Sequence, residues 1–454
     1  MKDSSIWSNT VNLKKFPTLD KNIKTKVLVI GGGITGILCA YELKKRNIDC
    51  ILVERDTIGK GISKNTTAFI TAQHELLYQD IIKKHGIKNA KTYLRLNLRA
   101  LHEYRKLGDT FDIDFQNCSS IMFSSESKST ILKEKIALDK LGYKTEFVNK
   151  LPLKDIDIKL GIKFNRQGKL NPLKLINVLS NDLEIYEHTR VENIKRNKAY
   201  ANNHIIEFDK VIIASHYPLI DRTGLYFLKL FQRRSYVVAL KHRSFSDTYC
   251  SVDVDGMYFR SYGNYLIIGG NDRNVGRECK CSFIDKIKKL YKYENIDYYW
   301  SNQDLITIDQ IPYIGKYDIF HKNWYVATGF DLWGFTWAMV SSFVLIDMIE
   351  GKRGIKLLSP QRFWIKKQLF VNIGNTLKNM ITFRRPRCTH LGVALKYNKV
   401  DNTYECPAHG SRFDKDGKVL NGPAKRNSDS TIFNKESVFD NMQKTKKSRN
   451  ILNE

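Results

Sequence analysis

The chain has 454 residues, 42% of them hydrophobic, and a formal net charge of +28. This length exceeds what one simple core accommodates, so we expect two or three domains. Polar residues interrupt the apolar stretch "WAMVSSFVLIDMI". It is also shorter than the roughly 18–20 residues of a membrane span, so it predicts a buried core helix and no transmembrane segment. Because no apolar signal sequence opens the chain, we expect a cytoplasmic protein.

The positive charge is spread along the whole chain, where lysines occur together with many Asn, Ile and Tyr residues. This distribution indicates a compositional bias and not a binding stripe, so we predict no nucleic-acid binding. The charge instead favours an acidic redox partner or an anionic substrate. Eight cysteines are too few for a disulfide scaffold in a chain of this length.

A nucleotide-binding signature stands in "KVLVIGGGITGILCAYELKKRNIDCILVERD". The apolar run "KVLVI" is typical of a buried parallel strand, and Gly31, Gly33 and Gly36 then fit GxGxxG at the start of a helix. These glycines permit a tight turn, close approach to a pyrophosphate and close helix–strand packing. Glu54 ends a second apolar run, 18 residues after Gly36, and is expected to bind the adenosine ribose hydroxyls. The pattern predicts FAD or NAD without separating them.

The next segment, "GKGISKNTTAFITAQH", resembles the loop after the acidic strand in the D-amino-acid oxidase-like flavoproteins, which include sarcosine and glycine oxidases. Further stretches resemble that family in order along the chain: "GKLNPLKLI", "HTRVENI", "DKVIIASHYP", "GMYFRSYGNYLIIGGNDRNVG", "IPYIG" and "ATGFDLWGFTWA". The resemblance implies FAD as the cofactor. It also implies further FAD-binding residues: Arg55, Thr66, Thr67, Val191, Gly329, Trp333, Gly334, Phe335 and Thr336.

The resemblance gives some of these residues a role. The backbone of Val191 is expected to meet the adenine, and Trp333 to Thr336 open a helix whose N-terminus would face the flavin. Several family members attach FAD covalently through a His or a Cys. Asn65 stands at roughly the His position and no Cys lies near the closing motifs, so we expect FAD to be bound without a covalent bond.

The resemblance implies an α/β protein, α+β overall, in which a doubly wound FAD-binding domain is interleaved with an antiparallel-sheet substrate domain. Alternating segments such as "RRSYVVALKHR" agree with strands of such a sheet. We expect an N-terminal segment 1–24 and an oxidoreductase region 25–358, with FAD-binding parts at about 25–85, 160–222 and 305–358 and substrate-domain parts at about 86–159 and 223–304.

The resemblance also implies a small amine, amino acid or related C–H donor as substrate. Candidates for the substrate face, each of which also suits a surface or structural position, are Arg234, Tyr236, Tyr258, Arg260 and Arg273. The sequence identifies no acid–base residue, and members of the family often oxidise C–N bonds by direct hydride transfer.

The stretch "CTHLGVALKYNKVDNTYECPAHGSRF" contains two Cys–His pairs, Cys388/His390 and Cys406/His409. Four such ligands would suit zinc, but zinc motifs usually pair Cys with Cys and His with His. Here each loop supplies one of each, as a Rieske [2Fe–2S] centre requires. "CTHLG", "CPAHGSRFD" and "DGKVLNGPA" resemble the Rieske family. The resemblance implies a small β-type cluster-binding subdomain at residues 386–426.

This sequence departs from the cytochrome-complex Rieske proteins at the positions of their extra disulfide, where Val393 and Ala408 stand. Phe413 replaces their hydrogen-bonding Tyr, although Ser411 remains. Fewer hydrogen bonds to the cluster sulfurs predict a lower reduction potential than in that branch.

The strands that usually precede the first ligand loop are missing, so we expect a minimal Rieske subdomain that needs the flavoprotein body for support. Residues 359–385 predict a helix and a basic linker, and residues 427–454 predict a flexible tail.

The sequence therefore predicts an FAD-dependent oxidoreductase with a fused one-electron relay, which serves a small-molecule substrate and a one-electron redox protein. Fusion keeps the relay at a high effective concentration. Two alternatives stay open at this point. The protein could be a reductase that receives electrons from a ferredoxin through the cluster, or a non-catalytic redox sensor.

Overall fold

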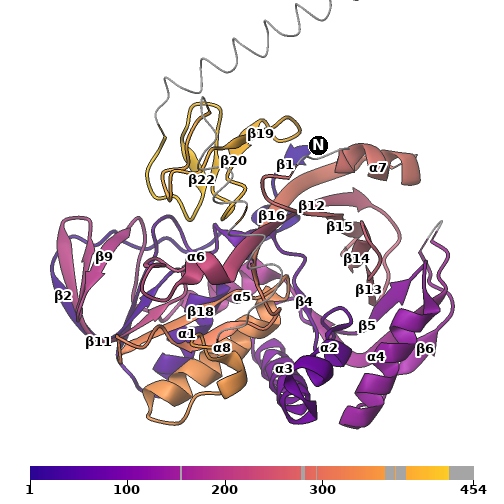
Figure 1. Ribbon diagram of the computed structural model, residues 1–454, viewed down its shortest axis with the longest axis horizontal. Helices are drawn as coiled ribbons and strands as arrows, with labels where there is room; N and C mark the ends of the chain where they lie inside the picture. Colours follow the sequence, from indigo (N-terminus) through magenta and orange to yellow (C-terminus); the bar gives the residue numbers. More distant parts are fainter. Residues whose placement is uncertain (154–155, 278–281, 293, 363–373, 375–384, 429–454) are drawn as a thin grey trace, which may run out of the picture.

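The computed structural model describes residues 1–153, 156–277, 282–292, 294–362, 374 and 385–428. These residues form three sheets, with helices packed around two of them (Figure 1). Most of the predicted linker, 359–385, and of the predicted tail, 427–454, lies outside the described residues.

The first sheet is the predicted doubly wound sheet, in the strand order β17-β18-β11-β2-β3-β8. All neighbours from β18 to β8 are parallel, and β17 pairs antiparallel with β18. Apolar runs form these strands because both faces of the sheet are covered. The strands are β2 (Ile23–Ile30), β3 (Cys50–Val53), β8 (Ile185–Tyr186), β11 (His204–Ile213), β17 (Tyr313–Lys316) and β18 (Trp324–Thr328), with β9 (Val191–Lys195) and β10 (Lys198–Ala201) attached beside β11.

Two helices on this sheet bury their apolar residues against each other. Helix α1 (Ile34–Lys45) connects β2 to β3 and packs against α8 (Gly334–Ile349). Every residue of α8 except Gly334, Asp347 and Met348 is buried, which confirms the predicted core helix. Among the described residues, no helix combines the length and the hydropathy needed to cross a membrane.

The second sheet follows the order β1-β16-β12-β15-β14-β13-β5-β7-β4 and is chiefly antiparallel, as predicted for the substrate domain. The predicted hairpin "GMYFRSYGNYLIIGG" forms two of its neighbouring strands. The strands are β1 (Lys2–Asp3), β4 (Phe69–Ile70), β5 (Gln116–Ser124), β6 (Glu146–Val148, beside β7), β7 (Leu160–Lys169), β12 (Leu230–Lys241), β13 (Thr248–Ser251), β14 (Met257–Tyr262), β15 (Tyr265–Asn274) and β16 (Ile296–Thr307).

The remaining helices join and cover the sheets. Asn171 caps the start of α5 by accepting hydrogen bonds from the Leu173 and Lys174 N–H groups, with Pro172 at the first helical position. The helices are α2 (Leu77–His85), α3 (Ile87–Thr110), α4 (Lys128–Leu141), α5 (Pro172–Ser180), α6 (Tyr226–Lys229) and α7 (Phe283–Leu290), with 3-10 turns η1 (Ile6–Asn9), η2 (Ile62–Asn65) and η3 (Lys356–Leu358).

The observed sheets shift the predicted domain boundaries. Strand β7, predicted in an FAD-binding part, pairs with β5 of the substrate sheet, and β4 pairs with β7. The chain therefore returns to the FAD-binding sheet only after β7. The N-terminal segment also belongs to the body, since Trp7 is fully buried in its core.

A third, small antiparallel sheet forms the Rieske subdomain, residues 386–426, which lies above β12, β16 and α6 in Figure 1. All of its described strands follow the first Cys–His pair, in keeping with the predicted minimal form. A turn at Asp416–Gly417 joins two of them, with φ +79° at Gly417. The strands are β19 (Lys396–Asn398), β20 (Thr403–Glu405), β21 (Arg412–Phe413) and β22 (Val419–Asn421).

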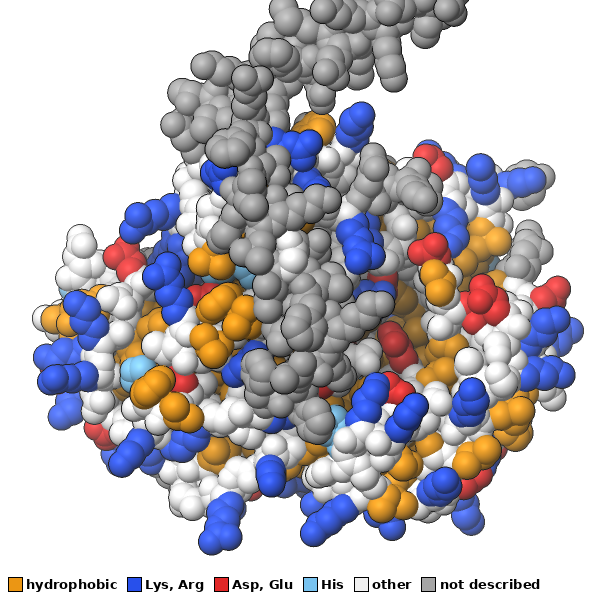
Figure 2. Space-filling view, in the orientation of Figure 1, with side chains coloured by type: hydrophobic (Ala, Val, Ile, Leu, Met, Phe, Trp, Pro, Cys, Tyr) orange, Lys and Arg blue, Asp and Glu red, His pale blue; other side chains and the backbone are white. Residues whose placement is uncertain are grey.

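Figure 2 shows Lys and Arg side chains distributed over the whole visible face of the molecule. This arrangement matches the even spread of lysines along the sequence.

Candidate functional site

The glycine loop between β2 and α1 is as tight as its sequence predicts. Gly31 has φ +112°, and a Cβ there would lie 2.6 Å from the Ala214 oxygen. A Cβ on Gly36 would lie 1.9 Å from the Gly31 oxygen, so any side chain at Gly36 would separate the helix from the loop. Only glycine satisfies both positions, and the start of α1 is left open to a phosphate group.

Glu54 is held beside this loop by two backbone groups. Its Oε2 accepts a hydrogen bond from the Gly32 N–H at 2.6 Å, and its Oε1 accepts one from the Asp56 N–H at 2.8 Å. Each oxygen keeps a further lone pair that a ribose hydroxyl can use. The structure thus places Glu54 where the sequence predicted it, and the ribose contact itself stays a prediction.

A cavity of about 610 Å³ extends from the glycine loop to the start of α8 and has the cradle that a dinucleotide cofactor requires. We call it the cofactor cavity. Of the residues predicted to bind FAD, those that line it are Gly31, Gly33, Glu54, Arg55, Thr66, Val191, Gly329, Gly334 and Phe335.

The other predicted FAD-binding residues lie nearby. Gly36 lies behind the loop, and Thr336 is buried with its hydroxyl bonded to the Thr71 oxygen at 3.0 Å. Thr67 and Trp333 line a second, adjoining cavity of about 330 Å³, which we call the substrate cavity.

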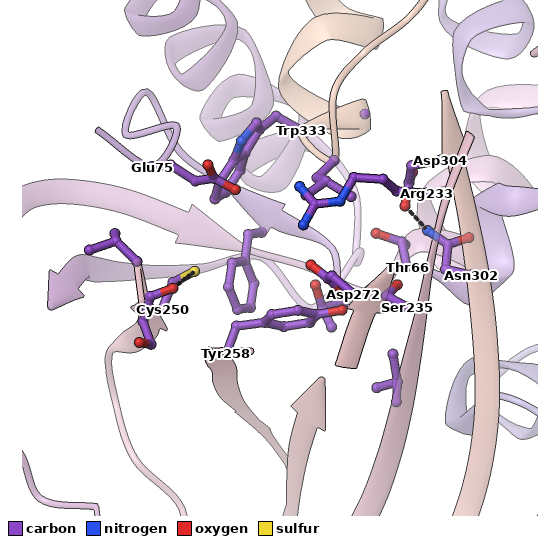
Figure 3. Close-up of a pocket in the computed structure, with 18 of the residues that line it drawn as sticks. Thr66, Glu75, Arg233, Ser235, Cys250, Tyr258, Asp272, Asn302, Asp304 and Trp333 are labelled. Atoms are coloured by element: carbon purple, nitrogen blue, oxygen red, sulfur yellow. Dashed lines mark hydrogen bonds between the residues drawn. The ribbon is translucent and has the colours of Figure 1, made fainter. Parts of the chain in front are cut away.

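Figure 3 shows the substrate cavity, into which Glu75, Arg233 and Asp272 project from different elements. Tyr258, a candidate for the substrate face, also lines it, and its contact with a substrate stays a prediction. The residues that line both cavities, and so mark where they meet, are Asn65, Thr66, Asn302, Asp304, Leu332, Gly334 and Phe335.

Strand alternation explains which side chains reach the substrate cavity. Arg233 on β12 and Asp272 on β15 line it, whereas their neighbours Arg234 and Arg273 point to the opposite face of the sheet and pair with the Rieske subdomain. On β16, Asn302 and Asp304 line the cavity, and Gln303 between them bonds to the Rieske loop. One face of this sheet therefore serves the substrate cavity and the other carries the Rieske subdomain.

This alternation relocates three of the predicted substrate-face residues. Arg234, Tyr236 and Arg273 meet Asp401 of the Rieske subdomain; the Tyr236 hydroxyl donates to Asp401 Oδ2 at 2.7 Å. Arg260 is also placed elsewhere. It is buried and donates to three backbone oxygens, of which those of Thr67, at 2.5 Å, and Ala68 belong to the loop beside the cavities.

The carboxyl groups of the substrate cavity have raised pKa values. Burial raises the pKa of Asp272 to about 6 and that of Asp304 to about 7, and neighbouring carboxylates add to the effect. Burial likewise raises the pKa of Glu75, against the opposing charge of Arg233. Asp331, close by, reaches a pKa of about 8 for the same reason. This concentration of partly buried acids with raised pKa values marks the cavity as a ligand site.

One cysteine in the substrate cavity had no sequence signal. Cys250 on β13 lines the cavity, and burial raises the pKa of its thiol well above the usual value. A protonated thiol is a poor nucleophile, so Cys250 gives no reason to expect a covalent flavin bond.

The four predicted cluster ligands come together between two loops of the Rieske subdomain. The thiols of Cys388 and Cys406 lie side by side, because a hydrogen bond between them is the main cause that lowers the pKa of Cys388. The rings of His390 and His409 have centroids 5.1 Å apart. Within the described part of the chain, no three His, Cys, Asp or Glu side chains are arranged to hold a single metal ion. A pair of thiols and a pair of imidazoles is instead what the two irons of a [2Fe–2S] cluster need.

The histidine rings show which atoms are available to a cluster. The Nδ1 atoms of His390 and His409 are buried and have no hydrogen-bond partner in the described structure. The other ring nitrogen of His390, Nε2, lies 2.6 Å from Asp221 Oδ2 of the flavoprotein body. A carboxylate on the far nitrogen is the usual support of a metal-bound imidazole. The donor set therefore fits the cluster through Nδ1.

The second ligand loop is bonded directly to the flavoprotein body. Gln232 on β12 donates to the His409 oxygen at 2.6 Å, and Gln303 donates to the Gly410 oxygen at 2.7 Å. Gln232 also lines the cofactor cavity, together with Arg412 and residues 420–425 of the Rieske subdomain. Residues of the Rieske subdomain outside the ligand loop itself thus form part of the wall of the cofactor cavity.

Sequence reasoning missed the residues that join the parts: Asp221, Gln232, Gln303, Asp401 and Glu405. It also missed Glu75, Arg233, Asp272 and Asp304 of the substrate cavity. Alternation along the predicted strands could have separated Arg233 from Arg234, but no local pattern indicates which face meets which part.

The chain is similar to known proteins along most of its length. Residues 26–348 match the family described as FAD dependent oxidoreductase, and residues 359–438 match the Rieske [2Fe-2S] domain. YhfW of Bacillus subtilis (strain 168), described as a Rieske 2Fe-2S iron-sulfur protein, is 30% identical over 92% of this chain and 95% of its own length. Gamma-glutamylputrescine oxidoreductase of Escherichia coli (strain K12) is 22% identical over 77% of this chain and 89% of its own length.

Among solved structures, L-proline dehydrogenase from P. horikoshii superposes with a TM-score of 0.64 and 21% identity, covering 75% of this chain and 98% of that chain. This likeness concerns the fold, in which an FAD-binding sheet and a substrate sheet are interleaved as described above.

Proposed function

Because the chain belongs to the FAD dependent oxidoreductase family and carries a Rieske [2Fe–2S] domain, we propose that it oxidises a small amine or amino-acid-like substrate and releases the electrons singly. It is an enzyme, and its cofactors are FAD and a [2Fe–2S] cluster. When bound, FAD would supply an acceptor for a hydride from a C–H bond beside nitrogen, and the cluster would supply exchange of one electron at a time.

The observation that carries this proposal is the shared wall between the two cofactor sites. Gln232 lines the cofactor cavity and holds the backbone of the cluster ligand His409. Arg412 and residues 420–425 close the same cavity from the Rieske side. A relay benefits from this arrangement because it keeps the two redox sites adjacent throughout the catalytic cycle.

The chain's own residues have three tasks in this scheme. Asn65, Thr66 and Asn302 stand where the two cavities meet and would orient the substrate C–H towards the flavin. The Rieske residues that close the cofactor cavity exclude water from it. The N-terminus of α8, which opens at Gly334 beside both cavities, offers its positive dipole end to the negative charge of a reduced flavin.

Anaerobic mixing with a panel of amines and amino acids tests the proposal. A substrate should bleach the flavin absorbance, and a one-electron acceptor should then restore it. Cys406→Ala removes one cluster ligand and should leave bleaching intact while slowing the return. Cys118→Ala, at another buried cysteine on β5, is the matched control and should behave as the unchanged protein.

Other outcomes would favour the alternatives. Bleaching by a reduced ferredoxin alone would assign the protein as a reductase that receives electrons through the cluster. A flavin that neither donor reduces would indicate a sensor. If the one-electron acceptor restored the flavin absorbance of Cys406→Ala at an unchanged rate, the cluster would have a structural role.

We also propose that FAD is bound without a covalent bond and that Glu54 binds its ribose. Acid precipitation should release the yellow flavin, and a pellet that stays yellow would contradict the first point. Glu54→Ala should weaken FAD binding markedly, because it removes hydrogen bonds to a charged group worth roughly 1.5–3 kcal/mol each. An unchanged FAD affinity would remove Glu54 from the site.

The proposed partner is a one-electron redox protein, whose acidic surface would suit the net charge of +28. The proposed location is the cytoplasm. Apart from the two cluster ligands, the cysteines in the described part of the chain, Cys39, Cys50, Cys118 and Cys250, form no disulfide with one another, in keeping with a reducing compartment.

A further inference from the structure

The substrate cavity is acidic although the protein as a whole is strongly basic. Five carboxylates and one guanidinium line its 330 Å³: Glu75, Asp253, Asp255, Asp272, Asp304 and Arg233. They come from separate elements, so acids stand on several walls and not at one corner. A substrate whose only charge is negative would meet repulsion on most sides.

These acids differ in whether their carboxylates already have partners within the protein. Asp253 accepts hydrogen bonds from the Ser124 side chain and the Ser125 N–H, and Asp304 accepts one from Asn302. Among the described residues, Glu75 and Asp272 form no ion pair within 4 Å, although the charge of Arg233 in the same cavity acts on both, and Asp272 Oδ1 is a buried atom without a hydrogen-bond partner. Glu75 and Asp272 are therefore available to a ligand.

A second polar group in the same wall also lacks a partner. Asn302 is only 8% exposed, and its Oδ1 accepts no hydrogen bond from the described residues. Buried polar atoms are nearly always satisfied in proteins, so an unsatisfied acceptor at a cavity indicates a missing donor. Ammonium groups, which carry N–H donors and no acceptors, supply what both Asn302 and Asp272 lack.

The remaining lining is apolar and aromatic. Phe69, Val237 and Leu332 offer surfaces for methylene groups, and the rings of Tyr258 and Trp333 can also face a cation. The cavity thus combines hydrocarbon walls with acids at different points of its circumference.

We infer that the substrate is a dication, an aliphatic chain with two ammonium groups, and that Glu75 and Asp272 determine this specificity. The inference rests on the proposed amine oxidation and names its substrate class. A single ammonium group brings one positive charge to two carboxylates without an ion-pair partner, whereas two groups on one chain match the charge of both. Raised pKa values at Asp272 and Glu75 agree with acids that ionise fully only when cations approach.

Two sources share this chemistry, namely a free diamine and a dibasic amino acid whose carboxylate pairs with Arg233. A binding titration of the oxidised holoenzyme under anaerobic conditions separates these two sources. Binding is measured as the change in the visible absorbance spectrum of the flavin. The probes are 1,4-diaminobutane and L-lysine, each with a partner that lacks the second charge, n-butylamine and L-norleucine. At least one dication should bind about tenfold or more tighter than its partner, and the better of the two identifies the source.

Glu75→Gln and Asp272→Asn keep the side-chain shape and remove the charge. Either should reduce the preference for the dication by about tenfold, while Asp139→Asn, an exposed acid on α4, should leave the preference unchanged. Two independent variants keep the test decisive if one of them fails to fold. Equal binding of each dication and its partner with a single ammonium group, or a preference that survives both variants, would overturn the inference.

The same experiment separates failure of the inference from failure of the proposed function. If dications bind selectively but never bleach the flavin, the inferred binding specificity is supported and the proposed amine oxidation is contradicted. If n-butylamine or L-norleucine bleaches the flavin as well as the dications do, the proposed amine oxidation is supported and the inference of a dication substrate is contradicted.

Discussion

On one face of β12, β15 and β16, Arg234 and Arg273 are buried against Asp401 and Glu405, with nitrogen–oxygen distances of 3.1 to 3.3 Å. On the opposite face of β15, one residue away, Asp272 borders a cavity and forms no ion pair within 4 Å among the described residues.

The same strands therefore carry charge in two different ways. Matched buried charges hold one protein part on another and lose much if a partner is removed. Unmatched buried charges weaken the empty protein and are retained where a ligand completes them. Substitutions on the two faces should differ accordingly in size and in sign.

Asp401→Ala should have the largest effect, because it leaves Arg234 and Arg273 buried without this carboxylate. Breaking a buried pair in this way costs about 3–5 kcal/mol of stability. We expect earlier thermal unfolding and less iron and acid-labile sulfide per chain. Asp416→Ala, in the exposed turn of the same subdomain, is the control. Normal iron content in Asp401→Ala would mean that the ion pairs do not hold the subdomain in place.

Gln303→Met should have a smaller effect on the same face. It keeps the volume but removes the donor to the Gly410 oxygen, and an unsatisfied buried group costs about 1–3 kcal/mol. Thermal unfolding and the rate of tryptic cleavage in the Rieske segment measure the loss. The exposed Gln116 of β5 provides a matched Gln→Met control. Identical cleavage of both variants would show that this hydrogen bond contributes nothing to docking.

Tyr236→Phe removes a hydroxyl that donates to Asp401 and accepts from Arg273 while the ion pairs remain. We expect a loss of about 0.5–1.5 kcal/mol in chemical denaturation. Tyr299→Phe changes the ring stacked on Tyr236 in the same chemical way and serves as the comparison. A larger loss in Tyr299→Phe than in Tyr236→Phe would assign the effect to packing.

Asp304→Asn, on the cavity face, should instead stabilise the protein, and only at higher pH. Burial raises the folded-state pKa of Asp304 to about 7, so the folded chain holds this proton more tightly than the unfolded chain does. The stability contributed by that proton is complete below pH 4 and is lost as the pH rises through 7. The variant avoids this loss, so its melting temperature should exceed that of the unchanged protein by about 1–3 °C at pH 8 and by less at pH 5. An equal difference at both pH values would contradict the shifted pKa.

The parts of the site that could be predicted from sequence are those encoded by neighbouring residues. Gly31, Gly33 and Gly36 are read from one turn, and the cluster ligands from two short loops, because the geometry of each depends on local backbone conformation. Contiguous apolar runs likewise predicted the first parallel strand and the core helix α8, whereas the two interleaved sheets were implied by the family resemblance.

The docking residues and the substrate cavity could not be predicted, because they depend on which faces of distant segments meet. Arg273 and Asp272 are adjacent in sequence and equally polar, yet one binds the Rieske subdomain and the other lines the cavity. The boundary at β7 was misplaced for the same reason, since strand pairing with β5 is a long-range choice.

Where the Rieske subdomain packs on the flavoprotein body, each part presents a glycine to the other. A Cβ on Gly276 of the body would lie 2.5 Å from the Pro407 backbone, and a Cβ on Gly410 of the subdomain would lie 2.7 Å from the Gln232 side chain. Each part therefore has a glycine where a side chain would clash with the other part. For protein engineering, this means that the subdomain cannot be transferred to another protein without matching changes. A foreign Rieske module grafted onto this body, or this module grafted onto another flavoprotein, needs the reciprocal glycine in its new host before the two parts can dock.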